Sequence, residues 1–145
     1  MRRAAAAAGV VDVAIFAGER PASAIPAYLL AADALVSPRS RGTNTPLKIY
    51  QYLRSGKPIV ATRLLTHTQV LSDETAILTG PTSREFADGI IAALQDPARA
   101  AAVAARAREL AETKYSYAAY LDRTRQACAA LLPSPAGVAV AKDVA

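Results

Sequence analysis

The sequence predicts an α/β fold: a partial Rossmann-like parallel sheet of about four strands, with flanking helices and a helical C-terminal region. Three observations carry this prediction. Short runs rich in β-branched residues recur before Gly80, the gaps between them suit helices, and after Gly80 only helical patterns follow. Strands that alternate with helices in this way favour right-handed βαβ units and a parallel sheet.

The predicted strands are short apolar runs bounded by Gly, Pro or Asp. They are VVDVAIFAG (10–18), ADALVSP (32–38), KPIVATR (57–63) and TAILTG (75–80). An alanine-rich helix predicted at 2–8 has no strand before it. A helix at this place in a doubly wound fold covers a neighbouring pair of strands, so the chain is expected to begin partway through a domain.

Helical patterns fill the gaps between the strands and the stretch after Gly80. The predicted helices are 21–32, 46–56, 66–73, 82–96, 98–114 and 116–132. Two residue pairs, Thr66 with Gln69 and Thr82 with Glu85, have the spacing of a capping box. Both pairs therefore predict a helix N-terminus.

The composition fits one globular domain, predicted over residues 1–132, with a flexible tail at 133–145. The hydrophobic fraction of 52% and the charged fraction of 20% argue against wholesale disorder. Asp12 interrupts the N-terminal apolar run, so neither a membrane span nor a secretion signal is predicted. The single cysteine, Cys128, excludes an internal disulfide and favours a cytoplasmic protein. One histidine without clustered carboxylates predicts no metal site.

The net charge of +5 and the pI near 9.7 admit nucleic acid, anionic lipid and phosphorylated ligands as partners. Tyr115, Tyr117 and Tyr120 precede Arg123 and Arg125, and interleaved aromatic and basic residues can stack on nucleic acid. At helical spacing, we favour the interpretation that these tyrosines pack the last helix across the sheet, with the arginines in solvent. No nucleic-acid partner is therefore expected.

The segment TNTPLKIYQYLRSGKPIVAT (43–62) has the signals of a short, well-delimited helix. Thr45 is predicted as its N-cap and Pro46 as its first residue, where no N–H is needed. Gly56 can take the left-handed conformation that ends a helix, and Pro58 prevents the helix from continuing. Ordinary helix capping explains both ends.

The preceding loop, SPRSRGTN (37–44), is long for a strand-to-helix connection and carries Arg39 and Arg41. In an open parallel sheet such loops lie at the carboxyl edge, where ligands bind. The free N–H groups of the helix N-terminus attract anions, and Lys48 would add a charge-assisted bond. Two interpretations stay open from these residues alone: a phosphate site, and a solvated basic loop.

His67 is the only histidine and follows the strand predicted at 57–63. A general base would need a partner and a substrate within hydrogen-bond reach. We expect a structural role for this lone histidine, at a place where it could still line a ligand pocket.

Three segments in this order resemble the C-terminal half of family-4 glycosyltransferases: IPAYLLAADALVSP, GTNTPLKIYQYLRSGKPIVAT and THTQVLSDETAILTGP. The resemblance spans about residues 10–130. These relatives are retaining enzymes of the GT-B fold that transfer sugars from nucleotide diphosphates, and they generally need no metal. The resemblance implies that this chain is the donor-binding half of such an enzyme, with a nucleotide-sugar as partner, no cofactor and an unknown acceptor.

The resemblance also implies site residues. The family has two glutamates eight positions apart, and here those positions hold Thr43 and Gln51. Gln51 would bond the ribose hydroxyls, and Thr43 would lie by the donor sugar. The backbone amides between them contact sugar and phosphates in the family; Asn44, Thr45 and Leu47 can supply such N–H groups. The remaining candidates are Arg41 and Lys48 for the phosphates, and Gly18, in the loop AGER (17–20), near the base.

The family's N-terminal acceptor domain and the first strands of its donor domain have no counterpart in this sequence. The chain alone is therefore expected to be inactive or very weak, and to be completed in the same chain or by a separate one. The alternative is a non-catalytic, truncated or degenerate relative that acts as a structural or partner-binding module, which Thr43 and Gln51 favour. Many relatives act on lipid-linked acceptors, so peripheral contact at the inner face of the membrane is compatible with the sequence.

Overall fold

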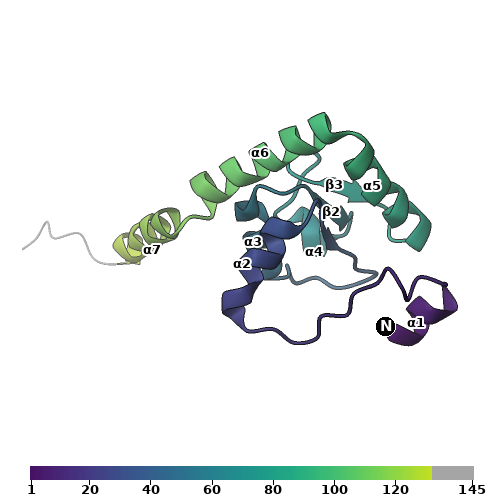
Figure 1. Cartoon of the computed structure of the whole chain (residues 1–145). Coiled ribbons are helices and arrows are strands. Elements are labelled where there is room, and N and C mark those ends of the chain that lie inside the picture. Colours follow the sequence, from purple (N-terminus) through teal and green to yellow (C-terminus); the bar gives the residue numbers. More distant parts are fainter. Residues whose placement is uncertain (132–145) are drawn as a thin grey trace, which may run out of the picture.

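The centre of the molecule is a parallel sheet of three strands in the order β1–β2–β3 (Figure 1). The strands are β1 (Leu35–Ser37), β2 (Ile59–Thr62) and β3 (Ile77–Thr79). Val36 pairs with Val60, and Val60 pairs with Ile77, so neighbouring strands run in register. The computed structural model describes residues 1–131, and the tail predicted at 133–145 lies outside them.

The helices follow one another along the chain in the order that the sequence predicts (Figure 1). They are α1 (Arg2–Ala7), the 3₁₀ turn η1 (Ala22–Ala24), α2 (Ile25–Ala31), α3 (Lys48–Ser55), α4 (Leu65–Thr68), α5 (Ser83–Gln95), α6 (Pro97–Lys114) and α7 (Tyr117–Leu131). The α/β class, three of the four strands and the sequence of helices are therefore confirmed. No helix within residues 1–131 is both long and apolar enough to cross a membrane.

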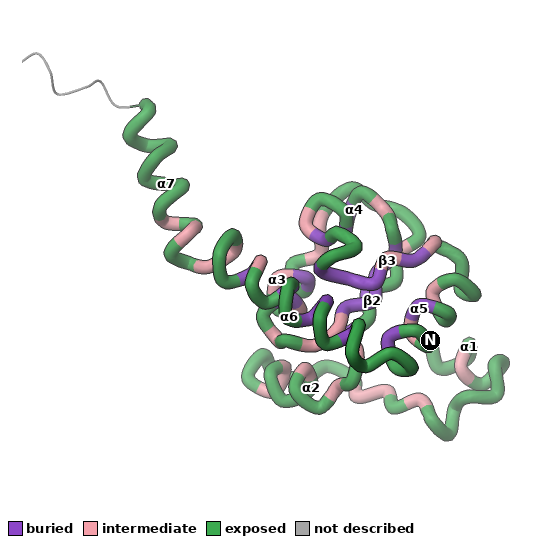
Figure 2. Tube along the Cα trace, turned by 90° about the horizontal axis from the view of Figure 1, so that it is seen from above, coloured by how far each residue is buried: buried purple, intermediate pink, exposed green. Residues whose placement is uncertain are grey.

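The two faces of β2 build two cores, because successive side chains of a strand point to opposite faces. Ile59 and Ala61 pack with Ile49 and Leu53 of α3 and with alanines of α6. Val60 packs on the other face with Ile77 and with Ala93 of α5. Figure 2 shows the buried residues concentrated along the strands and the helix sides that face them. When a parallel sheet is covered on both faces, the sequence of each strand is a nearly continuous apolar run, as in β2.

The strand predicted at 10–18 is wrong. Val10 closes a turn instead, with its carbonyl accepting from the N–H groups of Val13 and Ala14. Val13 and Ile15 are 81% and 93% exposed on the coil between α1 and η1. A strand needs a neighbour for its backbone N–H and C=O groups, and no strand of the described residues lies beside this segment.

The helix-capping predictions have mixed outcomes. The capping box of Thr82 and Glu85 is confirmed at the start of α5, and Gly56 ends α3 with φ 71°. Thr45 is not the N-cap of α3, because the first turn is tight: Ile49 N–H donates to the Pro46 carbonyl over three residues. The prediction for Thr66 is also wrong, since α4 begins one residue earlier.

The last helix does not cross the sheet as predicted. α7 has no buried residue and projects away from the sheet, beyond the end of α6 (Figures 1 and 2). The face that it would cover is already occupied by α3 and α6. Tyr115, just before α7, packs edge-to-face on Tyr50 of α3 at 5.1 Å between ring centres. The arginines at 123 and 125 are exposed, as predicted.

Gly89 provides a direct test of how closely α5 packs on the sheet. A Cβ at this position would lie 2.2 Å from Cγ2 of Thr79 and 3.3 Å from Cγ1 of Val60. We expect Gly89→Ala to lower the free energy of unfolding by about 1–2 kcal/mol, because overpacking costs more than the gain in helix propensity. Urea unfolding of the chain measures this change.

Thr79→Ser is the matched second variant, because it removes the methyl group that the new Cβ would meet. In the Thr79→Ser background, Gly89→Ala should become neutral or stabilising. Equal destabilisation in both backgrounds would contradict the proposed contact.

Candidate ligand site at the carboxyl edge of the sheet

The three strands end at one edge of the sheet, at Ser37, Thr62 and Thr79. The loop 38–47 leaves β1 there and leads to α3, and short connections lead from β2 to α4 and from β3 to α5. All three strands are parallel, so the segments that follow them gather at the same edge. Most of the candidate ligand-binding residues predicted from the sequence lie at this edge.

His67 of α4 lies at the centre of this edge and is completely buried. Its Nδ1 is 2.8 Å from the carbonyl oxygen of Thr62, which can only accept, so Nδ1 carries the proton. In the neutral ring Nε2 is then an acceptor, and it accepts a hydrogen bond from the hydroxyl of Ser37 at 2.9 Å. His67 therefore joins the ends of β1 and β2.

The environment keeps His67 neutral. Burial lowers the pKa of its imidazole from the ordinary value. The hydrogen bond with Thr62 acts in the opposite direction, and the charges of Arg39 and Lys48 lower this pKa further. With both ring nitrogens engaged and no exposed surface, His67 fits the structural role expected from the sequence.

The loop 38–47 is held by side chains from the end of β2 and from the segment that follows it. The N–H of Arg39 donates to Oγ1 of Thr62 at 3.1 Å. Farther along, the side-chain amide of Gln69 donates from Nε2 to the carbonyl of Thr43 at 2.6 Å. Oγ1 of Thr45 lies 3.5 Å from Oε1 of the same amide, at the limit of a hydrogen bond. Thr43, Asn44 and Leu47 are exposed, Leu47 to 82%.

Lys48 begins α3 and reaches the free edge of the sheet. Leu35 N–H pairs with Pro58 next to β2, so the backbone groups of Val36 face the opposite, open side of β1. Nζ of Lys48 donates to the Val36 carbonyl at 3.3 Å, and the Tyr52 hydroxyl lies 3.5 Å from the same oxygen. Partial removal from water, and then the charge of Arg39, lower the pKa of Lys48.

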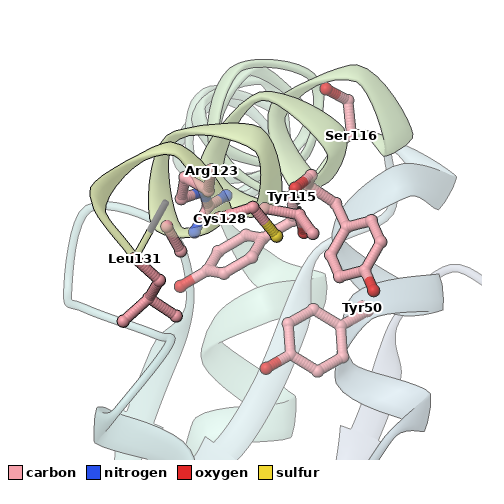
Figure 3. A pocket seen from close by; sticks show the side chains of 9 residues that line it. Tyr50, Tyr115, Ser116, Arg123, Cys128 and Leu131 are labelled. Carbon is pink, nitrogen blue, oxygen red and sulfur yellow. Dashed lines mark hydrogen bonds between the residues drawn. The ribbon is translucent and has the colours of Figure 1, made fainter. Parts of the chain in front are cut away.

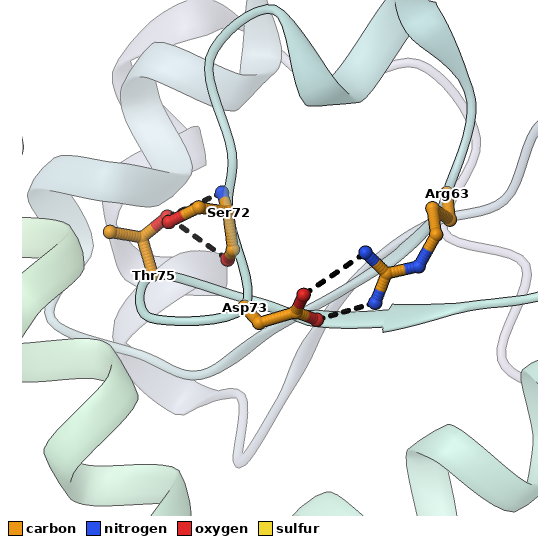
Figure 4. A network of polar contacts seen from close by, with 4 residues as sticks. All are labelled: Arg63, Ser72, Asp73 and Thr75. Atoms are coloured by element: carbon orange, nitrogen blue, oxygen red, sulfur yellow. Dashed lines mark hydrogen bonds and ion pairs between the residues drawn. The ribbon is translucent and has the colours of Figure 1, made fainter.

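The edge is positively charged. No Asp or Glu occurs between Asp33 and Asp73, whereas Arg39, Arg41 and Lys48 lie in the loop and the first turn of α3. Arg63 also leaves this edge, but its guanidinium forms two bonds to the carboxylate of Asp73, at 2.5 and 3.0 Å (Figure 4). The cations available to a ligand are thus those of 38–48.

The structure brings together most of the candidate residues. Arg41, Thr43, Asn44, Thr45 and Leu47 lie consecutively on the loop, and Lys48 follows them. Gln51 is exposed one turn after Leu47, on the side of α3 that borders a depression shared with α2. Gly18 lies on the coil between α1 and η1 and forms no hydrogen bond with 37–51 within the described residues.

Two depressions differ in their relation to this edge. One, of about 480 Å³, lies beside the loop and is lined by Arg39, Ser40, Thr62, Thr82 and Phe86. A larger one, of about 630 Å³, lies between α3 and α7, where Tyr50 and Tyr115 face Cys128 and Arg123 (Figure 3). Only the first borders the strand ends, and it adjoins the start of the loop at Arg39 and Ser40; residues 41–51 do not line it.

Sequence reasoning missed Gln69 as a contact of the loop, because its spacing from Thr66 matched a capping box. Thr66 instead lies inside α4, and its buried hydroxyl has no hydrogen-bond partner within residues 1–131. The available signal was positional: Gln69 follows the strand 57–63 at the edge where the loop 37–44 was already placed. No group of three or more His, Cys, Asp or Glu gathers in the described residues in a way that could hold a metal ion.

The family model of glycosyl transferases group 1 matches residues 1–96, and the chain belongs to this family. HepE from Anabaena in complex with UDP has a TM-score of 0.82 at 20% identity, over 89% of this chain and 35% of HepE. Sucrose-phosphate synthase from Thermosynechococcus elongatus has a TM-score of 0.79 at 22% identity, over 90% of this chain and 33% of that enzyme.

The C-terminal domain of LpcC, a glycosyl transferase group 1 protein from Francisella tularensis, has a TM-score of 0.69 at 23% identity. That match covers 80% of this chain and 60% of the LpcC chain. The fold is thus the C-terminal domain of a GT-B protein. The chain spans about a third of the length of HepE and of the synthase. No curated protein sequence matches the chain significantly.

The neutral state of His67 makes stability depend on pH. Its pKa is lower in the folded protein than in the unfolded chain, so the unfolded chain binds more protons as the pH falls. We expect the stabilising contribution to be complete above pH about 6.5, the ordinary value for histidine, and to be lost as the pH falls towards the lowered pKa. Urea unfolding between these limits measures the slope.

His67→Asn is the control, because the amide can keep a donor near the Thr62 carbonyl and does not titrate. The variant should be less stable at neutral pH but should have a flatter stability profile over this range. Identical slopes for the two proteins would contradict a buried neutral imidazole.

Proposed function

We propose that this chain forms the donor side of a retaining glycosyltransferase, and that the loop 38–47 with the start of α3 binds the diphosphate of a nucleotide-sugar. One observation carries the proposal: a basic, carboxylate-free loop with unused N–H groups lies at the carboxyl edge of a parallel sheet in a chain of this family. Such edges are where ligands bind in open α/β sheets.

The loop offers neutral donors for phosphate oxygens. The N–H groups of Asn44, Thr45 and Leu47 donate no hydrogen bond to the described residues. They precede α3, whose dipole also favours an anion near its start. Pro46 has no N–H to offer, so the donors lie on both sides of it.

Lys48 keeps hydrogen-bond donors that a phosphate could use. An ammonium group has three N–H donors, and the Val36 carbonyl uses one of them. The other two donors make no hydrogen bond to the described residues. Arg41 lies in the exposed part of the loop and would add a second charge. Gln51 would hold the ribose hydroxyls by neutral hydrogen bonds, and Thr43 would lie by the sugar.

The reaction would break the bond between the anomeric carbon and the distal phosphate and form a bond from that carbon to an acceptor oxygen, with retained configuration. The acceptor's proton would leave with the released nucleoside diphosphate. Negative charge grows on the diphosphate in the transition state, and fixed N–H and ammonium donors stabilise it. The acceptor side would come from a further domain, since the relatives are about three times as long.

A second candidate is a non-catalytic module of the same family. The residues that favour it are Thr43 and Gln51, which leave the loop and α3 without any carboxylate. Transfer of labelled sugar by the longest natural protein that carries this chain distinguishes the two. Turnover supports the transferase, whereas ligand binding without turnover, across donors and lipid-linked acceptors, supports the module.

Lys48→Ala tests the phosphate contact. HepE was solved with UDP and with UDP-glucose, so UDP is the probe, followed by calorimetry or by amide chemical shifts in NMR. Loss of one hydrogen bond to a charged group predicts an affinity for UDP about tenfold weaker. The affinity should also fall with added salt, because exposed charges are screened.

Lys57→Ala is the matched control. It removes the same charge at the opposite edge of the sheet, just before β2, and should leave the UDP affinity unchanged. Equal weakening by both variants would mean a general charge effect, and no weakening by Lys48→Ala would remove Lys48 from the site.

A further inference from the structure

The loop 38–47 has no regular backbone pairing of its own. Among the described residues, no backbone–backbone hydrogen bond is donated from within 38–47. An exposed loop without such bonds takes its conformation from whatever side chains hold it. Here these side chains all come from the segment 62–69, the end of β2 and α4.

The first attachment is at the start of the loop and rests on buried groups. Oγ1 of Thr62 accepts the N–H of Arg39 and lies 3.2 Å from Nδ1 of His67. Nε2 of His67 in turn accepts a hydrogen bond from the Ser37 hydroxyl. Since Ser37, Thr62 and His67 are all buried, this end of the loop is fixed to the core.

The second attachment is the side chain of Gln69, directly after α4. Its Nε2 donates to the Thr43 carbonyl at 2.6 Å, a short bond. The C=O of Thr43 and the N–H of Asn44 belong to one planar trans peptide and point in opposite directions. By turning the carbonyl of Thr43 towards α4, Gln69 therefore turns the N–H of Asn44 away from α4, out of the segment that holds the loop.

We propose that Gln69 is a positioning residue, which holds the loop 38–47 in the conformation that presents the Asn44 and Thr45 N–H groups to the ligand. The proposal rests on the proposed function of this loop. Gln69 itself does not touch the ligand; it acts through the peptide between Thr43 and Asn44. A loop that is already ordered loses less conformational entropy on binding, so the attachment strengthens affinity without adding a contact.

Gln69→Met tests the proposal, because methionine matches the length of glutamine without its amide and without adding charge. Thr68→Val is the control on the neighbouring residue, which is also exposed and whose hydroxyl donates to the carbonyl of Leu64, the residue before α4. Two quantities are measured on the whole chain: NMR order parameters of the backbone over 40–47 without ligand, and the affinity for UDP. The thermal midpoint is followed alongside.

We expect Gln69→Met to lower the order parameters of the loop from about 0.85 to below about 0.6. The UDP affinity should fall about fivefold, as for the loss of one hydrogen bond, and the thermal midpoint should stay unchanged. Thr68→Val should change neither the loop nor the affinity. Loosening confined to 40–47 is a response that a general loss of stability does not produce.

Three other outcomes are decisive. Unchanged order parameters in Gln69→Met overturn the proposal, since the loop would then be ordered by other means. A loosened loop with unchanged UDP affinity also overturns it, because the loop's conformation would not matter for binding. In the third outcome the loop loosens in Gln69→Met while UDP binds to none of the three proteins, the unaltered chain included. In that case Gln69 does order the loop, and the proposed function of the loop fails.

Discussion

The hydrogen bonds of one buried imidazole hold the carboxyl edge of this protein together. His67 accepts a hydrogen bond from the hydroxyl of Ser37 in β1 and donates one to the carbonyl of Thr62 at the end of β2. Buried polar groups are costly unless they are paired, so this arrangement fixes where both strands end and where α4 starts. The position of the loop 38–47 follows from it, since Thr62 also accepts the N–H of Arg39.

Charge is the second constraint on this edge. Without a carboxylate between Asp33 and Asp73, nothing in that stretch neutralises Arg39, Arg41 or Lys48. Burial lowers the pKa of both His67 and Lys48; the charges of Arg39 and Lys48 lower that of His67 further, and the charge of Arg39 lowers that of Lys48 further. Like charges held near one another cost free energy until an anion compensates them. The proposed diphosphate would compensate these charges.

The sequence was sufficient to predict those structural features that a few neighbouring residues determine. The capping box of Thr82 and Glu85, the left-handed Gly56 and the buried run of β2 all depend on a few neighbouring residues, and the structure contains each of them. The general rule that loops after parallel strands gather at the carboxyl edge placed the loop before α3 there. These features define the α/β fold and the location of the candidate site.

The features that the sequence did not predict depend on distant partners. The segment 10–18 has the composition of a strand but no strand beside it, so its backbone closes a turn. Thr45 has the right residue type for an N-cap, yet the chain enters α3 through a tight turn at Pro46. Gln69 meets Thr43 across 26 positions, which no local pattern encodes. The contacts that order the site are therefore visible only in three dimensions.

The most direct test of the account is a crystal structure of the chain with UDP. We expect the diphosphate against the N–H groups of Asn44, Thr45 and Leu47, with the ammonium of Lys48 in contact and the Gln69–Thr43 hydrogen bond preserved. A diphosphate bound elsewhere, such as the depression between α3 and α7, would contradict the assignment of the site. A structure in which Gln69 leaves Thr43 when UDP binds would contradict the role given to Gln69.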